Sequence, residues 1–178
     1  MSGVLAAVEG RRSYSRVTAE APTHDDLVPL VAASARVADH GALRPWRLIE
    51  LRGDDRVRLG DAIAQAEHDD KPSQKPLRAS LLIAVVVSPK KSAKVPHWEQ
   101  EAVASGVAHT LSLLLADAGW GVIWRTGHTT RTKPVRKLHG LTKKEQLLGW
   151  LYVGGIPENA KVGHRKVIDG EEFLSRLP

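Results

Sequence analysis

Apolar residues recur along the chain in two kinds of spacing, and these predict a mixture of helices and strands. The longest periodic segment, Trp98–Ala118, has an apolar or small residue every three or four positions, which is typical of a helix with one face in the core. Gly119 directly after it favours the left-handed conformation that ends helices. Leu81–Ser88 is instead a continuous apolar run rich in β-branched residues, which predicts a central strand buried on both faces.

Two more helices are predicted near the N-terminus. Val4, Leu5 and Val8 follow helical spacing as far as Gly10, and Ser2 can cap that helix. A second helix begins after Thr23, which stands three residues before an aspartate as in a capping box. Its apolar positions predict that it ends near Ala38.

The rest of the chain continues the mixed pattern. The polar segment His68–Lys75 is predicted to be a surface excursion, and the segment 154–178 has too little core-forming sequence to pack by itself. The other predicted elements are strands at 46–52, Gly121–Arg125 and Leu147–Val153 and helices at Asp55–Glu67 and Pro134–Leu138.

Length and composition predict one globular domain over residues 1–178. The chain has 178 residues, 42% of them hydrophobic and 26% charged. A chain of this size buries roughly 70% of its unfolded surface, which is enough for one substantial core and too little for two. The composition excludes disordered, collagen-like and coiled-coil proteins.

The chain has no cysteine. Disulfide scaffolds, cysteine-ligated zinc, iron–sulfur clusters and thiol nucleophiles are therefore excluded, and we expect a reduced, cytoplasmic compartment. The first twelve residues lack the apolar run of a secretory signal, and Leu81–Val87 is too short to span a bilayer. We therefore expect a soluble protein with no membrane partner.

A net charge of +6 raises the question of an anionic partner, and phosphate is the obvious candidate. A basic nucleic-acid-binding module is one alternative. Aromatic residues make up only 4% of the chain, and the basic residues are spread in pairs, so this charge gives little support to specific nucleic-acid binding.

Three clusters could carry chemistry. Arg11–Arg16 holds three guanidiniums and two hydroxyls, which suit a phosphomonoester, although the residues alone favour a solvated C-terminal cap, because basic residues are favourable at a helix end. Asp39 could orient the imidazole of His40, or it could satisfy a local turn. Trp120–His128 brings an indole, a guanidinium and a hydroxyl to a glycine turn, where the tryptophans could also be ordinary packing residues.

Other common motifs are missing from the sequence. The eight histidines show neither HExxH nor another close metal-binding spacing, so no metal site is predicted. The sequence also has no P-loop, no GxGxxG after a strand and no GxSxG.

Four blocks, RRSYSR, ADHGALRPW, VPHWEQEA and GWGVIWRTG, together resemble the nitroreductase family, and most of all its small YdjA-type branch. The resemblance implies an α+β fold with a central, mostly antiparallel sheet flanked by helices. It also implies an intertwined homodimer with FMN in a cleft at the subunit interface. The C-terminal tail, about 155–178, is then expected to reach onto the partner subunit.

The resemblance also implies site residues. Arg11, Arg12 and Ser13 match the family's first flavin-binding block, and Trp124, Arg125 and Thr126 match its last. Arg36 and His40 match positions that reach the FMN bound mainly by the other subunit. NAD(P)H is expected to meet Leu114, Leu115, Ala116, Asp117, Ala118 and Gly119.

The implied activity is an FMN-dependent NAD(P)H oxidoreductase that reduces nitroaromatics, quinones or similar flat acceptors by a ping-pong mechanism. Because flavin N5 carries the hydride, no catalytic side chain is expected. The main alternative is an FMN-binding storage or sensor protein with little turnover.

Overall fold

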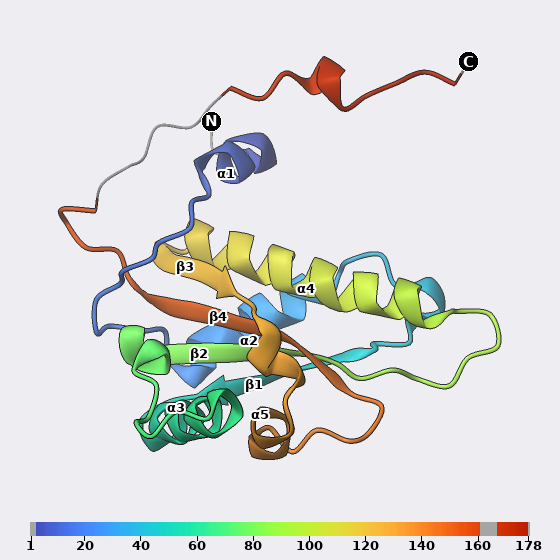
Figure 1. Cartoon of the computed structure of the whole chain (residues 1–178). Helices are drawn as coiled ribbons and strands as arrows, with labels where there is room; N and C mark the ends of the chain where they lie inside the picture. Colours follow the sequence, from blue (N-terminus) through green and yellow to red (C-terminus); the bar gives the residue numbers. More distant parts are fainter. Residues whose placement is uncertain (1–2, 161–166, 178) are drawn as a thin grey trace.

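The computed structural model describes residues 3–160 and 167–177, and a four-stranded sheet forms its centre. The strand order is β1-β2-β4-β3, with antiparallel pairing throughout, so β1 and β3 are the edges (Figure 1). The strands are β1 (Trp46–Leu51), β2 (Leu81–Val87), β3 (Trp120–Arg125) and β4 (Gln146–Gly155).

Helices cover both faces of this sheet. α4 lies over one face, while α3 and α5 lie over the other (Figure 1). The α-helices are α1 (Val4–Gly10), α2 (His24–Ser34), α3 (Asp54–Glu67), α4 (His97–Asp117) and α5 (Lys133–Leu138). Single-turn 3₁₀ helices are η1 (His40–Ala42), η2 (Lys75–Arg78), η3 (His128–Arg131) and η4 (Gly170–Glu172). The α+β prediction is confirmed for the fold of one chain.

β2 is the strand that the uninterrupted apolar run predicts. All seven of its residues are buried. Successive side chains of a strand point to opposite faces, so Leu81, Ile83 and Val85 join one core cluster while Leu82 and Val86 join the other. The strand is apolar throughout because it has no solvent face.

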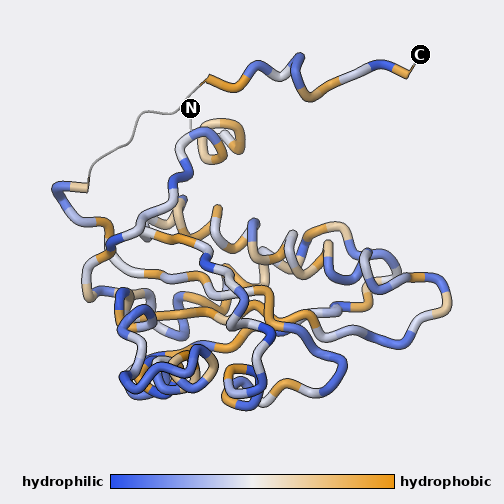
Figure 2. The backbone as a smooth tube through the Cα atoms, viewed as in Figure 1, coloured by the Kyte–Doolittle hydropathy of each residue, from blue (hydrophilic) through white to orange (hydrophobic). Residues whose placement is uncertain are grey.

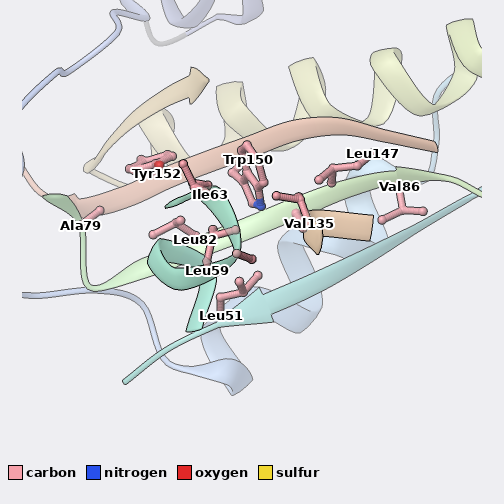
Figure 3. Packing of buried hydrophobic residues seen from close by; sticks show 12 residues of the cluster. Leu51, Leu59, Ile63, Ala79, Leu82, Val86, Val135, Leu147, Trp150 and Tyr152 are labelled. Carbon is pink, nitrogen blue, oxygen red and sulfur yellow. The ribbon is translucent and has the colours of Figure 1, made fainter. Parts of the chain in front are cut away.

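Figure 3 shows the core on the α3 and α5 face. Leu59 and Ile63 of α3 and Val135 of α5 pack here against the sheet, beside the large rings of Trp150 and Tyr152. On the opposite face, the periodic positions of α4 meet Leu27 of α2 and the other side of β2. The continuous apolar run of β2 and the helical spacing of apolar residues in the helices predict which residues belong to these two clusters.

The start of α2 forms the predicted capping box. The backbone N–H of Asp26 donates to Oγ1 of Thr23 at 3.2 Å, and the N–H of Thr23 donates to the Asp26 carboxylate at 2.9 Å. The Thr23 hydroxyl also donates to this carboxylate at 2.7 Å. This bond, followed by the one from the Thr23 N–H, lowers the pKa of Asp26. The cap fixes the first turn of α2.

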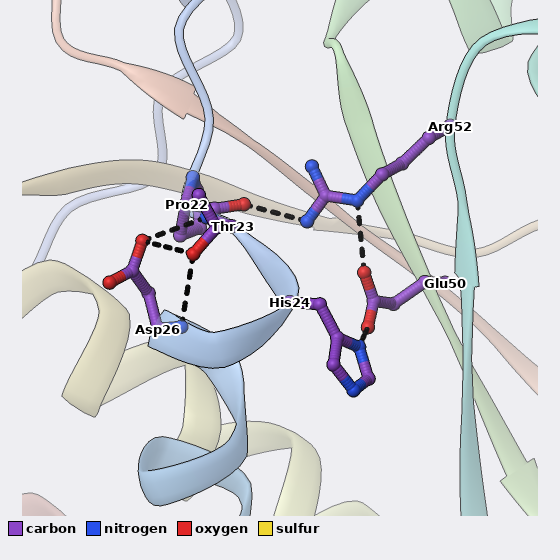
Figure 4. Close-up of polar contacts among 6 residues, drawn as sticks. All are labelled: Pro22, Thr23, His24, Asp26, Glu50 and Arg52. Carbon is purple, nitrogen blue, oxygen red and sulfur yellow. Dashed lines mark hydrogen bonds and ion pairs between the residues drawn. The ribbon is translucent and has the colours of Figure 1, made fainter.

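An ionic clamp ties this turn to β1 (Figure 4). Nδ1 of His24 lies 2.5 Å from the Glu50 carboxylate, and Nε of Arg52 donates to the same carboxylate at 2.9 Å. Arg52 also donates to the carbonyl of Pro22 at 2.6 Å. Burial raises the pKa of Glu50, but the hydrogen bonds from His24 and Arg52 outweigh it and hold that pKa below its usual value.

Two predicted boundaries were wrong. α2 ends at Ser34 and not near Ala38. The chain turns away there, because Val37 packs against α4 at Gly106, where an added Cβ would stand 3.6 Å from the Val37 side chain. β4 continues past Val153 through Gly155, since Gly154 and Gly155 still pair with β3. The proposed cap Ser2 lies outside the described residues, and Gly3 takes the N-cap position.

The two ends of the chain pack poorly against the rest. α1 has no buried residue, and Val4 and Leu5 are 80% and 71% exposed. The described C-terminal segment, 167–177, is exposed throughout, yet Figure 2 shows hydrophobic positions along it. Its apolar side chains are Val167, Ile168, Phe173, Leu174 and Leu177. Residues 161–166 and 178 of the predicted tail lie outside the described residues.

Candidate functional site

The segment after α1, residues 11–20, crosses the end of β3 and β4, and we call it the N-terminal strap. Ser13 forms a parallel bridge with Val122, and the N–H of Tyr14 donates to the Val122 carbonyl at 3.1 Å. Further along, the N–H of Thr18 donates to the carbonyl of Gly155 at 2.8 Å. Backbone bonds at both ends therefore fix where the side chains of the strap lie.

Glycines make this crossing possible. A Cβ on Gly154 would lie 2.7 Å from the Thr18 carbonyl oxygen, and one on Gly121 would lie 3.0 Å from Val17. A Cβ on Gly155 would overlap the Thr18 hydroxyl. The strap can lie this close to the sheet only because these positions carry no side chain.

Three adjoining hollows follow the strap to the end of β3, and we call them together the trough. The hollow at the end of β3, about 450 Å³, is lined by Arg125 and Thr126 among others and is called the β3 hollow. It shares Arg78 and Arg125 with a second hollow of about 570 Å³. That one shares Ser15 and Arg16 with a third of about 410 Å³, which reaches Ser13. Each has the size of a small-molecule pocket.

The middle of the trough is basic. Arg16, Arg78 and Arg125 all line the second hollow. The Arg125 guanidinium lies over the ring of Tyr152 at 5.4 Å, and its Nε is buried with no hydrogen-bond partner among the described residues. Burial raises the pKa of Tyr152, so this phenol stays neutral at physiological pH. The arrangement suits a ligand that is flat and anionic and offers hydrogen-bond acceptors.

The three residues predicted on β3 lie on two faces of the strand. Trp124 packs edge-on against His109 at 5.0 Å, as the packing alternative expects, and its Nε1 is buried with no partner among the described residues. Arg125 points to the opposite face and Thr126 is exposed at the end of the strand. Trp124, Arg125 and Thr126 nevertheless all line the β3 hollow.

Arg11 and Arg12 line a separate hollow of about 240 Å³ at the C-terminal end of α4. Arg11 is the C-cap of α1 and donates to the hydroxyl of Ser13 at 3.5 Å. Ala116 and Asp117 line the same hollow, so part of the expected NAD(P)H segment meets this arginine pair. In the rest of that segment, Leu115 is fully buried, Leu114 is half-buried and Ala118 and Gly119 are exposed.

His40 lies at the other end of α4. Nδ1 of His40 lies 3.0 Å from the carboxylate of Glu99 in the first turn of α4. Asp117 stands eighteen positions after Glu99, which is about 27 Å along a helix axis. One chain therefore does not bring His40 together with the arginine pair. Arg36 is exposed and adjoins Val37, which lies beside Gly106 near the middle of α4. Asp39 accepts from the N–H of Arg44 at 2.7 Å, so it satisfies a local turn, and Glu99 is the carboxylate that pairs with His40.

Sequence reasoning found Arg16, within the Arg11–Arg16 cluster that it proposed for a phosphate, but it missed other residues of the trough. Arg78 and Tyr152 could not be found in this way, because η2 and the buried strand β4 bring them in from distant positions. Among the described residues there is no cluster of three or more His, Asp or Glu that could hold a metal ion. No helix in the described ranges has the length and apolar character needed to cross a bilayer.

Comparison with known protein sequences gives a consistent answer. The model of the nitroreductase family matches residues 8–155. The Escherichia coli K12 protein named "Putative NAD(P)H nitroreductase YdjA" is 35% identical over 158 residues, which cover 84% of this chain and 86% of that protein. A Haemophilus influenzae protein named "Putative NAD(P)H nitroreductase" is 26% identical over 97% of this chain and 98% of its own length.

Solved structures share the fold. A nitroreductase-like family protein from Bacillus cereus superposes with a TM-score of 0.84 at 21% identity, covering 99% of this chain and 97% of that one. The FMN and NADPH-dependent nitroreductase NfnB from Sphigopyxis sp. strain HMH gives a TM-score of 0.78 at 17% identity, covering 99% of both chains. At these identities the likeness establishes the fold.

Proposed function

The chain belongs to the nitroreductase family, and on this premise we propose that it is an FMN-dependent NAD(P)H oxidoreductase acting on nitroaromatics, quinones or similar flat acceptors. The observation that carries the proposal is the basic trough, in which Arg16, Arg78 and Arg125 converge beside the end of β3. Relatives named as NAD(P)H nitroreductases support the same reaction class.

The residues of the trough fit FMN. The buried, unpartnered Nε of Arg125 offers a hydrogen bond to a ligand, which a buried donor needs. No described residue comes within 4 Å of where a Cβ on Gly127 would stand, so a flat ring can approach its backbone. At the other end, Ser13, Ser15 and Arg16 offer hydroxyls and a guanidinium to a phosphate. Bound FMN would supply the hydride-carrying ring system.

The protein's own part is binding, orientation and charge. Arg78 and Arg125 place positive charge in the trough, which favours a ligand that becomes more anionic on reduction. We assign Arg11, Arg12, Ser13, Trp124, Arg125 and Thr126 to FMN binding as the sequence predicts, and we add Arg16 and Arg78. No side chain on this list has to act as a nucleophile, because the hydride moves between bound molecules.

A second copy of the chain would complete the site. His40 lies about 27 Å along α4 from the end that carries Arg11 and Arg12, and Arg36 adjoins Val37 beside the middle of the helix. In a homodimer with a two-fold axis, contacts are reciprocal, so each copy could bring these residues to the FMN of its partner. Exposed apolar residues of α1 and of 167–177 are the surfaces that we expect such a partner to cover.

The edge of β1 offers a place for the partner's tail. Among the residues that the structure describes, β1 pairs with β2 alone. An apolar groove of about 520 Å³ lies beside it, lined by Leu27 and Val31 of α2 and Leu48 of β1. An extended segment with apolar side chains can bind an open sheet edge in this way. Residues 167–177 have that character.

We propose that NAD(P)H and the acceptor use the site in turn, in a ping-pong cycle, with NAD(P)H contacting Leu114–Gly119. Ala116 and Asp117 support this position, because they line a hollow together with Arg11 and Arg12, next to residues that we assign to FMN. In such a cycle the two substrates would occupy the same pocket in turn, so each would exclude the other.

Reconstitution and turnover test the proposal together. Flavin-free protein titrated with FMN should bind it with an absorption change, and FAD should bind more weakly. The loaded protein should then oxidise NADPH in the presence of menadione or nitrofurazone. Folded protein that binds no FMN would refute the proposal, and FMN that stays oxidised under excess NADPH and NADH without oxygen would favour the storage or sensor alternative.

A further inference from the structure

Three segments bring charged side chains together at the β3 hollow. Glu67 is the last residue of α3, Lys75 begins η2 and His128 begins η3, and all three line this hollow. An oxygen of the Glu67 carboxylate lies 3.7 Å from Nε2 of His128 and 3.7 Å from Nζ of Lys75. The carboxylate therefore sits between an imidazole and an ammonium group.

The backbone beneath His128 is held in place although its ring is open to solvent. Gly127 has a φ of 150° and lets the chain turn sharply at the end of β3. The hydroxyl of Thr130 donates to the Gly127 carbonyl at 2.8 Å, and Thr129 and Thr130 are buried. The side chain of His128 is 79% exposed, so water can reach a ring whose position is set by the turn.

His128 is the one histidine among the described residues that line the β3 hollow. Histidine is the side chain that ordinarily exchanges a proton between pH 5 and 8. Three cationic side chains also face this space, those of Lys75, Arg78 and Arg125. In their charged forms they can donate hydrogen bonds but cannot accept a proton. Nδ1 of His128 has no hydrogen-bond partner within the described ranges, while Nε2 faces Glu67. A carboxylate 3.7 Å from one ring nitrogen, with the other nitrogen left open, resembles the pairing of carboxylate and imidazole in proton-transfer sites.

We propose that His128, positioned by Glu67, donates a proton to the electron acceptor bound in the β3 hollow. The inference rests on the proposed function and adds a residue to it. Reduction of a quinone to a hydroquinone adds two electrons and two protons. NAD(P)H, oxidised to NAD(P)⁺, supplies both electrons and one proton as a hydride equivalent by way of the flavin, and His128 supplies the second proton.

The proton transfer balances without another reactant. The Nδ1–H bond of the imidazolium breaks and an O–H bond forms on the acceptor, while the electron pair of the broken bond stays on Nδ1. The ring is then neutral and carries its remaining proton on Nε2, towards Glu67. It regains a proton from water through its exposed side. Lys75 shares the Glu67 carboxylate, so this carboxylate holds both the ammonium and the imidazole at the hollow.

The ring of His128 gives a first test that needs no cofactor. Its resonances, followed by NMR at one fixed pH and assigned by their loss in His128→Gln, should move in Glu67→Gln, because that substitution removes the carboxylate charge 3.7 Å from Nε2. Arg78 and Arg125 remain in this variant, so their influence on the ring cancels in the comparison. Resonances that Glu67→Gln leaves in place would overturn the positioning role of Glu67.

The second test uses two acceptors with different needs. Menadione takes up protons when it is reduced, whereas ferricyanide takes up electrons alone. His128→Gln should lower kcat/KM for menadione by about ten- to a hundredfold and remove the alkaline decline of its pH profile, while ferricyanide reduction stays unchanged. His68→Asn is the matched control, because His68 is an exposed, left-handed residue at the end of α3 that does not line the β3 hollow.

The outcomes separate this inference from the proposed function. Equal losses with both acceptors, or no loss with either, would overturn the role of His128 and leave the oxidoreductase proposal standing. If unaltered protein that has been offered FMN reduces neither acceptor, the proposed function fails and this inference fails with it. A selective loss with menadione that His68→Asn does not reproduce would support the proposal.

Discussion

Trp150 donates its indole N–H to Nε2 of His139 at 3.0 Å inside the core, and Nδ1 of the same ring lies 2.8 Å from the carbonyl of Val135. Because Nε2 accepts, the ring proton must sit on Nδ1, and the histidine is neutral in the folded protein. Burial is the main reason that the pKa of His139 is lowered, with the nearby charge of Arg47 adding to it. This residue is structural, unlike His128 at the trough.

This pair predicts how stability depends on pH. Below the ordinary histidine pKa of about 6.5 the unfolded chain gains a proton at His139 that the folded protein resists, so the free energy of unfolding should fall as pH drops through that value. In His139→Leu this part of the pH slope should vanish, while stability drops by about 1–3 kcal/mol because the Trp150 N–H loses its partner. Urea titrations at pH 8 and 5.5 measure both effects. Identical slopes in the two proteins would contradict the assignment, and the exposed His68→Asn provides the control.

A second prediction concerns Glu145, which is buried beside Arg47. Nε and Nη2 of Arg47 donate to its two carboxylate oxygens at 2.7 and 3.2 Å, and these bonds lower the pKa of Glu145 to about 2. The stabilisation is therefore present above about pH 4.5 and lost as pH falls towards 2. Glu145→Gln should flatten the acid limb of the stability curve over that interval.

Removing Arg47 gives the complementary result. Arg47→Met leaves the Glu145 carboxylate without its main partner and should cost about 1.5–3 kcal/mol at neutral pH. The double variant with Glu145→Gln should recover part of this loss, because no charge is then left unpaired. Strictly additive losses in the double variant would show that the pair does not interact.

The FMN assignment predicts that Arg12→Ala weakens cofactor retention. Loss of one charge-assisted phosphate contact costs on the order of 1.5–3 kcal/mol, which corresponds to an increase in Kd of roughly ten- to a hundredfold. Fluorescence titration with FMN measures it. Lys137→Ala, an exposed cation on α5, should leave the affinity unchanged, and equal effects in the two variants would point to net charge as the cause.

The shared-site model predicts complementation between two inactive variants. In a dimer of Arg12→Ala with Arg36→Ala chains, one site has lost both arginines and the other keeps both. Random mixing makes about half of the dimers mixed, so about a quarter of the sites should recover FMN binding. Recovery that does not rise above the average of the two variants would argue against a site made by two chains.

Position 149 of β4 requires glycine, because the backbone of Arg125 on β3 approaches it closely. Its φ is 142°, and a Cβ there would overlap the carbonyl oxygen of Arg125 on the neighbouring strand. Gly149→Ala should therefore cost about 3 kcal/mol or more, from strain and overlap together. Gly119→Ala is the control, with φ of 85° and nothing within 4 Å, and should cost only about 1–2 kcal/mol. Thermal denaturation of both variants tests the difference.

Sequence patterns predicted most elements because burial dictates them. β2 has no solvent face and α4 has a periodic apolar stripe, so Leu81–Val87 and His97–Asp117 appear in the sequence as they appear in the fold. The capping box at Thr23 is equally local. The end of α2 was missed because a distant contact, Val37 against Gly106 of α4, decides it.

The site was harder to predict than the fold. Ser13 and Arg125 stand in local blocks, but Arg78 reaches the trough from η2 and Tyr152 from β4, and neither has a neighbouring residue that marks it. The separation of His40 from the arginine pair depends on the direction of α4, which no local pattern reveals. The glycines at 121, 154 and 155 leave room for the N-terminal strap. Their role could not be predicted from the sequence, because nothing local shows that residues 11–20 cross these positions.

The length of α4 has an evolutionary consequence. If its two ends serve two separate cofactor pockets, the length of the helix fixes the distance between them. One inserted residue would lengthen the helix by about 1.5 Å and rotate the residues beyond it by about 100°. Such a change would misalign both pockets at once. Among related chains, insertions and deletions should therefore collect in the loops on either side of this helix, while the number of residues from Glu99 to Asp117 stays constant.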